Sequence, residues 1–263
     1  TDYESWKILK SPQISNDGKW VSYEVNPQKG DGRLFIYNTE SGTYDSIDRG
    51  YDAKFSGDSK IMVFKIKPQE DTMRKAKLAE AKKDELPKDS LGIYTPVKKH
   101  LVKIPDVKSY KIAEKGTDWV AYLLENAKAE EDTTPTADTT SVKKEEKKKK
   151  EKGNELVIMK VIEGKAFRFE NVTDYEVSRN GVRFGFITAI GDSIDSTRVY
   201  QFDTEKQLAE KLFEQPGEAK QIALDDEGKQ LAFVYSADTA DAKNYDLVYW
   251  RAKNDQANII IDS

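Results

Sequence analysis

The sequence predicts an all-β fold, a β-propeller with about five four-stranded blades, because one short phrase returns five times. In each copy a turn-forming stretch ends at an anchor residue, and an aromatic residue follows five or six positions later. The anchors recur about every 40 residues once two charged insertions, 70–90 and 127–154, are left out, and four short strands with their turns need that length. The anchors are Gly18, Ser59, Gly116, Gly181 and Gly228, and the aromatics are Tyr23, Phe64, Tyr122, Phe186 and Phe233.

The first copy shows the four strands of one blade. Residues 12–15 form a short first strand, and the Asn16-Asp17-Gly18 turn leads into a second strand at 20–25 that is rich in β-formers. A loop with Pro and Gly precedes a third strand at 34–37. A polar, alternating fourth strand at 43–47 is typical of a solvated edge.

The later copies fill the same positions. Third strands are expected at 91–94, 155–159, 198–202 and 246–250, and fourth strands at 101–104, 166–169, 209–213 and 258–261. The expected blades are 8–50, 51–106, 107–172, 173–217 and 218–263. A small or slim residue precedes each second-strand aromatic, which suits blades that taper toward an axis and stack face to face. These residues are Ser22, Val63, Ala121, Gly185 and Ala232.

Composition favours a globular chain. The 263 residues are long enough to bury a substantial core, and the net charge of −4 with mixed signs disfavours nucleic acid as a partner. No apolar run approaches the length of a membrane span. Cysteine is absent, so no disulfide is expected, which is compatible with a periplasmic or secreted protein. Because Thr1 lies just before the first copy and no signal peptide stands there, we expect the natural chain to begin upstream.

Both insertions are expected at the surface. Residues 70–86 have helical composition with a weak apolar stripe, which predicts a short exposed helix ended by Pro87. Residues 127–154 are Thr-rich and then carry the charge run 143–150, so disorder or a solvated helix is expected. A polyanion-binding arm is the alternative, and the interleaved glutamates disfavour it.

No residue set for catalysis is found. His100 is the one histidine and cannot supply a multi-histidine zinc site, so no metal and no cofactor is expected. No Gly-x-Ser-x-Gly elbow and no phosphate-binding glycine loop occurs. The Asp-rich stretch 191–196 lacks the spacing of a calcium loop and is interpreted as a hairpin loop. Paired carboxylates in a central tunnel could serve a glycosidase, but the sequence identifies none.

A family resemblance rests on three segments. Residues 14–23, with Trp6 upstream, look like the opening blade of bacterial prolyl oligopeptidase family peptidases, and residues 88–94 and 116–122 resemble the exported, dipeptidyl-peptidase- or acylaminoacyl-peptidase-like branch. The resemblance implies a seven- or eight-bladed propeller followed by an α/β-hydrolase domain with a Ser-Asp-His triad. The propeller then admits peptides and shields the catalytic cavity.

The chain departs from that pattern. It has five repeat units, no hydrolase domain and no elbow serine. In the dipeptidyl-peptidase branch a Glu-Glu pair holds the substrate amino terminus, but Glu130-Glu131 and Glu145-Glu146 lie in low-complexity sequence and match no motif, so no site residue is carried over. We therefore expect 1–263 to be a partial propeller, inactive alone, that gates peptide access to a C-terminal hydrolase domain in cis.

Two interpretations stay open. The alternative is a complete five-bladed propeller that acts as a binding module or glycosidase. A complete ring usually completes one blade with a strand from the other terminus, whereas here units one and five each supply four strands. We therefore favour a partial ring, whose end blades would expose apolar faces and could form a homodimer.

Overall fold

The computed structural model describes residues 6–82, 85–125, 153–190, 196–238 and 242–261, and it is built almost wholly of antiparallel strands. Blade 1 contains β1 (Lys7–Ile14), β2 (Trp20–Pro27), β3 (Arg33–Asn38) and β4 (Tyr44–Asp48). Blade 2 contains β5 (Gly50–Phe55), β6 (Met62–Ile66), β7 (Ser90–Thr95) and β8 (His100–Ile104). Blade 5 contains β16 (Glu218–Leu224), β17 (Gln230–Ser236), β18 (Asp246–Arg251) and β19 (Asn258–Ile261). Each of these blades is a sheet with its strands in chain order.

Blades 3 and 4 share one long strand. Blade 3 contains β9 (Val107–Ile112), β10 (Trp119–Leu124) and β11 (Asn154–Lys160), and blade 4 contains β13 (Arg183–Ile190), β14 (Ser196–Asp203) and β15 (Leu208–Pro216). Between them β12 (Lys165–Val177) pairs first with β11 and then with β13, and Val172 is partnered on both sides. The two blades therefore form one seven-stranded sheet.

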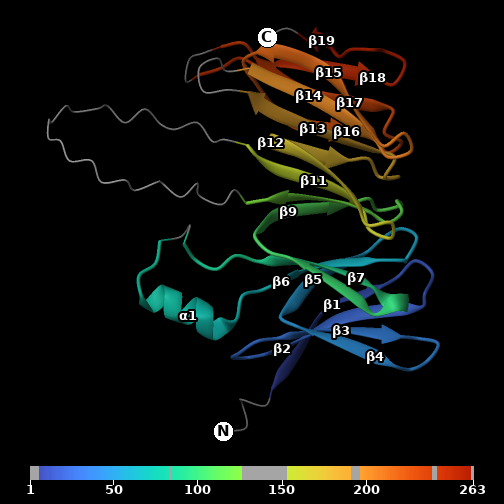
Figure 1. Ribbon diagram of the computed structural model, residues 1–263, viewed down its shortest axis with the longest axis vertical. Helices are drawn as coiled ribbons and strands as arrows, with labels where there is room; N and C mark the ends of the chain where they lie inside the picture. The colour runs from blue at the N-terminus through green and yellow to red at the C-terminus, as the bar shows by residue number, and fades with distance from the viewer. Residues whose placement is uncertain (1–5, 83–84, 126–152, 191–195, 239–241, 262–263) are drawn as a thin grey trace, which may run out of the picture.

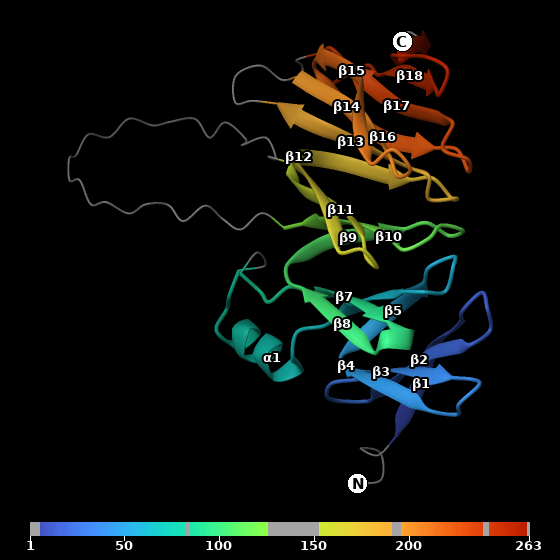
Figure 2. The same cartoon turned by 45° about the vertical axis from the view of Figure 1, so that its right-hand side comes forward.

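The blades stack face to face from one end of the molecule to the other. Figures 1 and 2 show β1–β4 beside the N-terminus and β16–β19 beside the C-terminus, with the other blades between them. The first and last strands, β1 and β19, belong to different sheets. The predicted all-β propeller architecture is confirmed, and the described residues form an open stack.

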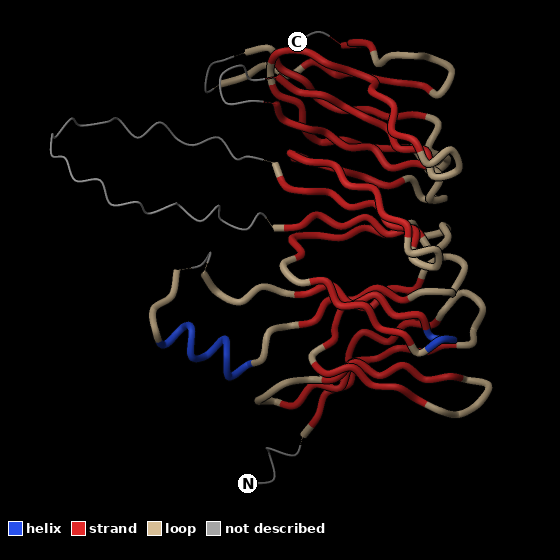
Figure 3. Tube along the Cα trace, in the orientation of Figure 1, coloured by secondary structure: helices blue, strands red, loops and turns tan. Residues whose placement is uncertain are grey.

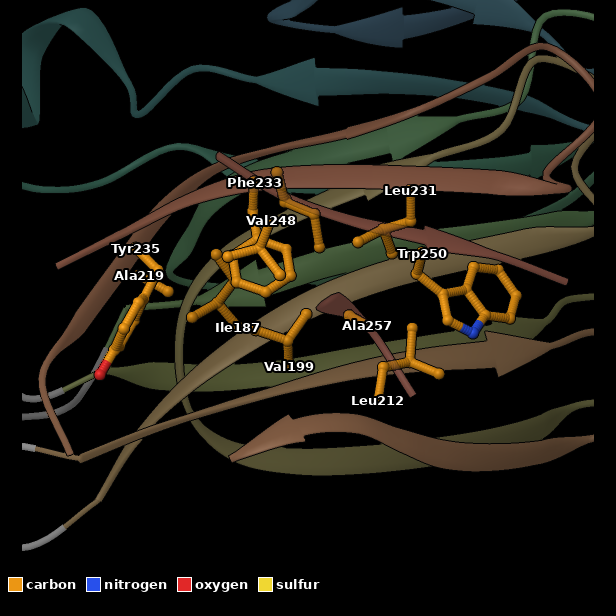
Figure 4. Packing of buried hydrophobic residues seen from close by; sticks show 11 residues of the cluster. Ile187, Val199, Leu212, Ala219, Leu231, Phe233, Tyr235, Val248, Trp250 and Ala257 are labelled. Atoms are coloured by element: carbon orange, nitrogen blue, oxygen red, sulfur yellow. The ribbon is translucent and has the colours of Figure 1, made fainter. Parts of the chain in front are cut away.

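Four apolar clusters hold neighbouring blades together, one at each junction. The junction of blades 4 and 5 is shown in Figure 4, where Ile187 and Val199 of blade 4 meet Phe233 and Val248 of blade 5. Each of these four side chains is at most 1% exposed. Burial of one such side chain contributes about 1.5–3 kcal/mol, so each junction stabilises the stack.

In the repeated phrase, the second-strand aromatic and the small residue before it lie on opposite faces of the blade. The second-strand aromatic packs against the preceding blade: Phe64, Tyr122, Phe186 and Phe233 lie in the clusters shared with blades 1, 2, 3 and 4. The small residue before it faces the following blade because successive strand residues point to opposite sides. A Cβ atom on Gly185 would lie 2.8 Å from Leu231 Cδ1 and 2.9 Å from Ile222 Cδ1, both in blade 5. Small residues therefore make room for the next blade.

The loops separate onto two sides of the stack. The β2–β3 loop and the helical insertion that follows β6 lie on one side, as Figures 1 and 3 show. We call this the loop side. The hairpin turns between first and second strands lie on the opposite side, which we call the turn side.

The helical insertion is shorter than predicted. Helix α1 (Glu70–Leu78) replaces the expected helix of 70–86, and it has no buried residue. Ala79 caps it, and Glu80 has a left-handed φ of 53°, which ends the helical path. Without tertiary packing, favourable composition alone does not sustain a longer helix. The first strand is also longer than expected, since β1 covers Lys7–Ile14 rather than 12–15.

Candidate functional site

The residues considered for chemistry in the sequence do not form a site. His100 opens β8, is exposed and pairs with Thr95 across the hairpin. Residues 191–195 of the Asp-rich stretch and both Glu-Glu pairs lie outside the described residues. Among the residues that the structure describes, no three metal-binding side chains gather, and none of their helices is long and apolar enough to cross a membrane.

Side-chain oxygens close the turns of the repeated phrase. Ser56 Oγ accepts a hydrogen bond from Ile61 N at 3.2 Å and donates to Asp58 Oδ1 at 2.7 Å. Ser15 and Ser178 repeat this pattern, and in the fifth copy Asp225 Oδ1 accepts from Gln230 N at 2.8 Å. The third copy has Ala113 at this position, which offers no acceptor, and its turn differs.

The turns are also bonded to one another across the blades. Asn16 Nδ2 donates to Gly57 O at 3.0 Å, and Lys115 N donates to Arg179 O at 2.8 Å. The guanidinium of Arg179 binds both oxygens of Glu114, at 2.7 and 2.8 Å, and reaches Asp226 at 3.2 Å. Bonded turns therefore tie blade 1 to blade 2, and blades 3, 4 and 5 to one another.

The first strands of the blades carry a polar network. Tyr110 OH donates to Asp52 O at 2.9 Å, and the hydroxyls of Ser109 and Tyr175 share a hydrogen bond of 2.9 Å. Burial raises the pKa of Tyr110 and of Tyr175 well above the ordinary tyrosine value, so both are neutral at physiological pH. This network links blades 2, 3 and 4 along their first strands.

A cavity of about 480 Å³ opens on the loop side between blades 1 and 2. We call it the loop-side pocket. Its volume lies in the range of small-ligand sites. Its apolar wall comes from Pro27, Pro68 and Met73 and from the ring of Tyr51. Its charged residues are Lys10, Asp31, Arg49, Lys67, Glu70 and Asp89.

Two carboxylates of the loop-side pocket accept hydrogen bonds from residues of its walls. Tyr51 OH donates to Asp89 Oδ2, and the Nζ of Lys67 lies 4.7 Å from the centre of the Tyr51 ring. Burial, with the bond to Asp89, raises the pKa of Tyr51 above the ordinary value, so the phenol keeps its proton. Asp31 Oδ1 accepts from Glu70 N at 3.0 Å and joins the β2–β3 loop to the start of α1.

A second cavity, of about 490 Å³, lies between the same blades on the turn side, and its lysines are paired. Lys19 lies 3.1 Å from Glu40, Lys60 lies 3.1 Å from Asp58, and Lys99 lies 3.1 Å from Asp45. We call it the turn-side pocket. With its charges internally satisfied, it offers little to an ionic ligand.

The loop-side pocket contrasts with it. Among the described residues, none of its cations Lys10, Arg49 and Lys67 has a carboxylate partner, and Arg49 Nε is buried without any hydrogen bond. These residues match no sequence motif, because a cation without a partner is recognised only once the surrounding chain is placed. One feature of the sequence could have indicated this site. Arg49 lies between two expected blades, at a junction where a tight turn favours Gly, Asn or Asp.

Comparisons with known proteins give structural matches alone: no family model matches the sequence, and no curated protein does. The fold is similar to the β-propeller domain of the Trilobed protease from Pyrococcus furiosus, with a TM-score of 0.48 and 13% identity over 97% of this chain and 72% of that one. It is also similar to Pyrococcus horikoshii acylaminoacyl peptidase, with a TM-score of 0.48 and 12% identity over 99% of this chain. An oligogalacturonate lyase in complex with manganese gives a TM-score of 0.49 and 11% identity over 95% of this chain and 64% of that one. The chain spans 40% of the acylaminoacyl peptidase.

Proposed function

We propose that this chain is part of a larger β-propeller in an exported serine peptidase, where it gates the access of peptides to an α/β-hydrolase domain of the parent protein. The position of Tyr23 carries the proposal. The equivalent aromatics of blades 2–5 are buried against a preceding blade, but the described residues contain no blade in front of Tyr23.

The outer face of blade 1 has the composition of an interior junction. The inner face packs on blade 2 through Trp20, Leu34 and Ile36, so the alternate residues face outward. Outward strand pairs join Leu9 to Val25, Tyr23 to Phe35 and Tyr37 to Tyr44. We call this set the blade 1 end face. Leu9 is 71% exposed and Tyr44 is 65% exposed. Exposure of such large apolar side chains to water has a free-energy cost that burial in the other blades avoids.

Blade 5 leaves a matching aliphatic face. Its buried side contributes Leu231, Phe233 and Val248 to the junction with blade 4, so the alternate residues point away. Val234, Leu247 and Ile261 lie in register across three strands on the outward side, and Ile261 is 59% exposed. Inside the stack, such aliphatic faces receive the aromatic of the next blade. The two ends therefore have the chemistry of a junction that further blades would complete.

The geometry favours this proposal over a complete five-bladed module. A closed ring of five would bring blade 1 against blade 5, but the two blades lie at opposite ends of the stack in Figures 1 and 2. The role in gating fits a rigid scaffold with the helical insertion and the β2–β3 loop on one side, since such loops can limit what reaches a catalytic domain. The serine peptidase activity, the peptide substrates and the periplasmic or secreted location rest on the sequence resemblance to the exported branch.

The test uses the natural polypeptide that carries this sequence. An antibody to the propeller is used to recover the protein from cell fractions, which are then treated with a fluorophosphonate that labels active serine hydrolases. We expect a labelled protein larger than the 29.9 kDa of this chain, in the periplasmic or secreted fraction, that cleaves short peptides and spares folded proteins. An unlabelled protein of this size would contradict the proposal.

A further inference from the structure

Arg49 occupies a backbone position that arginine does not favour. Each junction between blades contains one residue with a left-handed φ just before the next first strand: 63° at Arg49, 53° at Asp106, 58° at Asn171 and 125° at Gly217. Asp, Asn and Gly adopt this conformation readily, whereas other side chains are strained in it. Three of the four residues are of these types, and Arg49 is the exception among the junctions.

The backbone of Arg49 is held firmly. Arg49 N donates to Gly32 O at 2.8 Å, and Arg49 O accepts from Lys67 N at 3.0 Å. The second bond recurs at the next junction, where Glu125 N donates to Asp106 O at 2.7 Å. These bonds place the arginine between the two blades, where its side chain lines the loop-side pocket.

Arg49 makes no ion pair with another described residue, although carboxylates line the same pocket. Its Nε is buried with no hydrogen-bond partner, and an unsatisfied buried donor is costly. Lys10 and Lys67 line the same pocket, also without a carboxylate partner among the described residues. Two of the pocket's carboxylates, Asp31 and Asp89, already accept hydrogen bonds that hold its walls.

From this geometry we infer that the loop-side pocket binds a small ligand through a carboxylate or phosphate group. The guanidinium of Arg49 supplies the planar pair of donors that such oxyanions match, and Lys10 and Lys67 add positive charge from β1 and from the end of β6. The walls formed by Pro27, Pro68 and Met73 receive an apolar part of the ligand. The inference depends on the pocket alone and is independent of the proposed peptidase role.

Isothermal titration calorimetry on the 263-residue chain, at constant ionic strength, tests the site. The probes are sodium acetate, succinate, inorganic phosphate, trialanine and trialanine amide. We expect saturable binding of at least one oxyanion. Tighter binding of trialanine than of its amide would identify a peptide carboxylate as the ligand group, and tighter binding of inorganic phosphate would identify a phosphate. The absence of saturable binding for every probe would overturn the inference.

The substitution Arg49→Asn distinguishes a role of the Arg49 side chain in ligand binding from a role in stability. Asparagine suits the backbone, as it does at Asn171, so the melting temperature should be unchanged or higher while the association constant falls at least tenfold. Arg33→Asn is the matched control, because Arg33 is an exposed cation of the same blade, paired with Asp48 at 2.6 Å, outside the pocket lining. It should change binding by less than twofold. An equal loss in both variants would show nonspecific charge attraction and overturn the inference.

A second variant leaves the junction backbone untouched. Lys10→Met with Lys67→Met removes two cations but keeps Arg49, and we expect the association constant to fall several-fold with a weaker dependence on salt. Unchanged binding in this variant would contradict the assignment of all three cations to one site.

Discussion

The rings of Tyr23 and Phe35 are stacked, with centroids 5.4 Å apart and planes 9° from parallel, on a face that no other blade of the described residues covers. They face each other across paired strands, Tyr23 on β2 and Phe35 on β3. In the other four blades the residue equivalent to Tyr23 is at most 5% exposed. The pair therefore lies at the end of the described stack, in a position whose equivalents are buried in the other blades.

The blade 1 end face should cause the isolated chain to self-associate. Leu9→Lys places a charge in this face, so the fraction of associated protein in sedimentation velocity should fall. Leu208→Lys is the control, since Leu208 is also exposed, at 54%, but lies at the start of β15, away from both end faces. Equal effects of the two substitutions, or a wild-type chain that stays monomeric at all concentrations, would refute the role of this face.

Gly92 should be intolerant of any side chain. A Cβ atom there would lie 2.3 Å from Phe64 Cε2, and Phe64 is fully buried in the junction of blades 1 and 2. Gly92→Ala should lower the free energy of unfolding by about 1–3 kcal/mol in urea titrations. In combination with Phe64→Leu the loss should be smaller than the sum of the two single losses, because the smaller side chain leaves room. Additive losses would show that the contact is not the cause.

Ser56 should stabilise its turn measurably. Its Oγ accepts from Ile61 N, which is buried, so Ser56→Ala leaves that donor without its side-chain partner and should cost about 1–2 kcal/mol. Ser46→Ala, at an exposed position of β4, should change stability by no more than about 0.5 kcal/mol. Urea unfolding of both variants provides the measurement, and equal effects would count against a special role of the repeated turn.

The bond between Tyr94 and Asp45 should make the junction of blades 1 and 2 sensitive to acid. Tyr94 OH donates to Asp45 Oδ2 at 2.6 Å. Burial opposes ionisation of Asp45, but the hydrogen bonds from Tyr94 and Lys99 outweigh it, and the pKa of Asp45 lies below its ordinary value of 3.8. A carboxyl with a lowered pKa in the folded state adds stability above the unfolded-state pKa, and loses it as the pH falls through the folded-state value.

Tyr94→Phe should therefore cost about 1 kcal/mol at pH 7, and the difference from wild type should shrink below about pH 4. Unfolding free energies measured by urea titration between pH 7 and pH 3 test both parts. A difference that stays constant across this range would show that ionised Asp45 is not the group that the tyrosine stabilises.

The sequence predicted the repeat because its signal is local. The turns that begin at Ser15 and Ser178 place this serine two positions before Asp or Asn, and a glycine and an apolar strand follow. Their hydrogen bonds therefore join residues only a few positions apart. The alternation of small and aromatic residues likewise predicted face-to-face stacking. Gly185 lies where Leu231 of the next blade packs, and Phe186 lies in the junction with the preceding one.

Features that depend on partners far along the chain could not be predicted in this way. The pairing of β12 with both β11 and β13 depends on how blades 3 and 4 are placed relative to each other in the folded chain. Helix α1 stops at Leu78 although favourable residues continue, because it buries none of its residues. The cations of the loop-side pocket come from three separate segments, and only the folded arrangement shows that Arg49 has no partner.

The structure of the natural polypeptide that contains this sequence tests the central claim most directly, through the environment of Tyr23. We predict more than five blades, with Tyr23 and Phe35 buried beneath a blade that precedes β1 in the ring. A ring of five blades that leaves Tyr23 in solvent, or that closes by packing blade 5 on blade 1, would contradict the account.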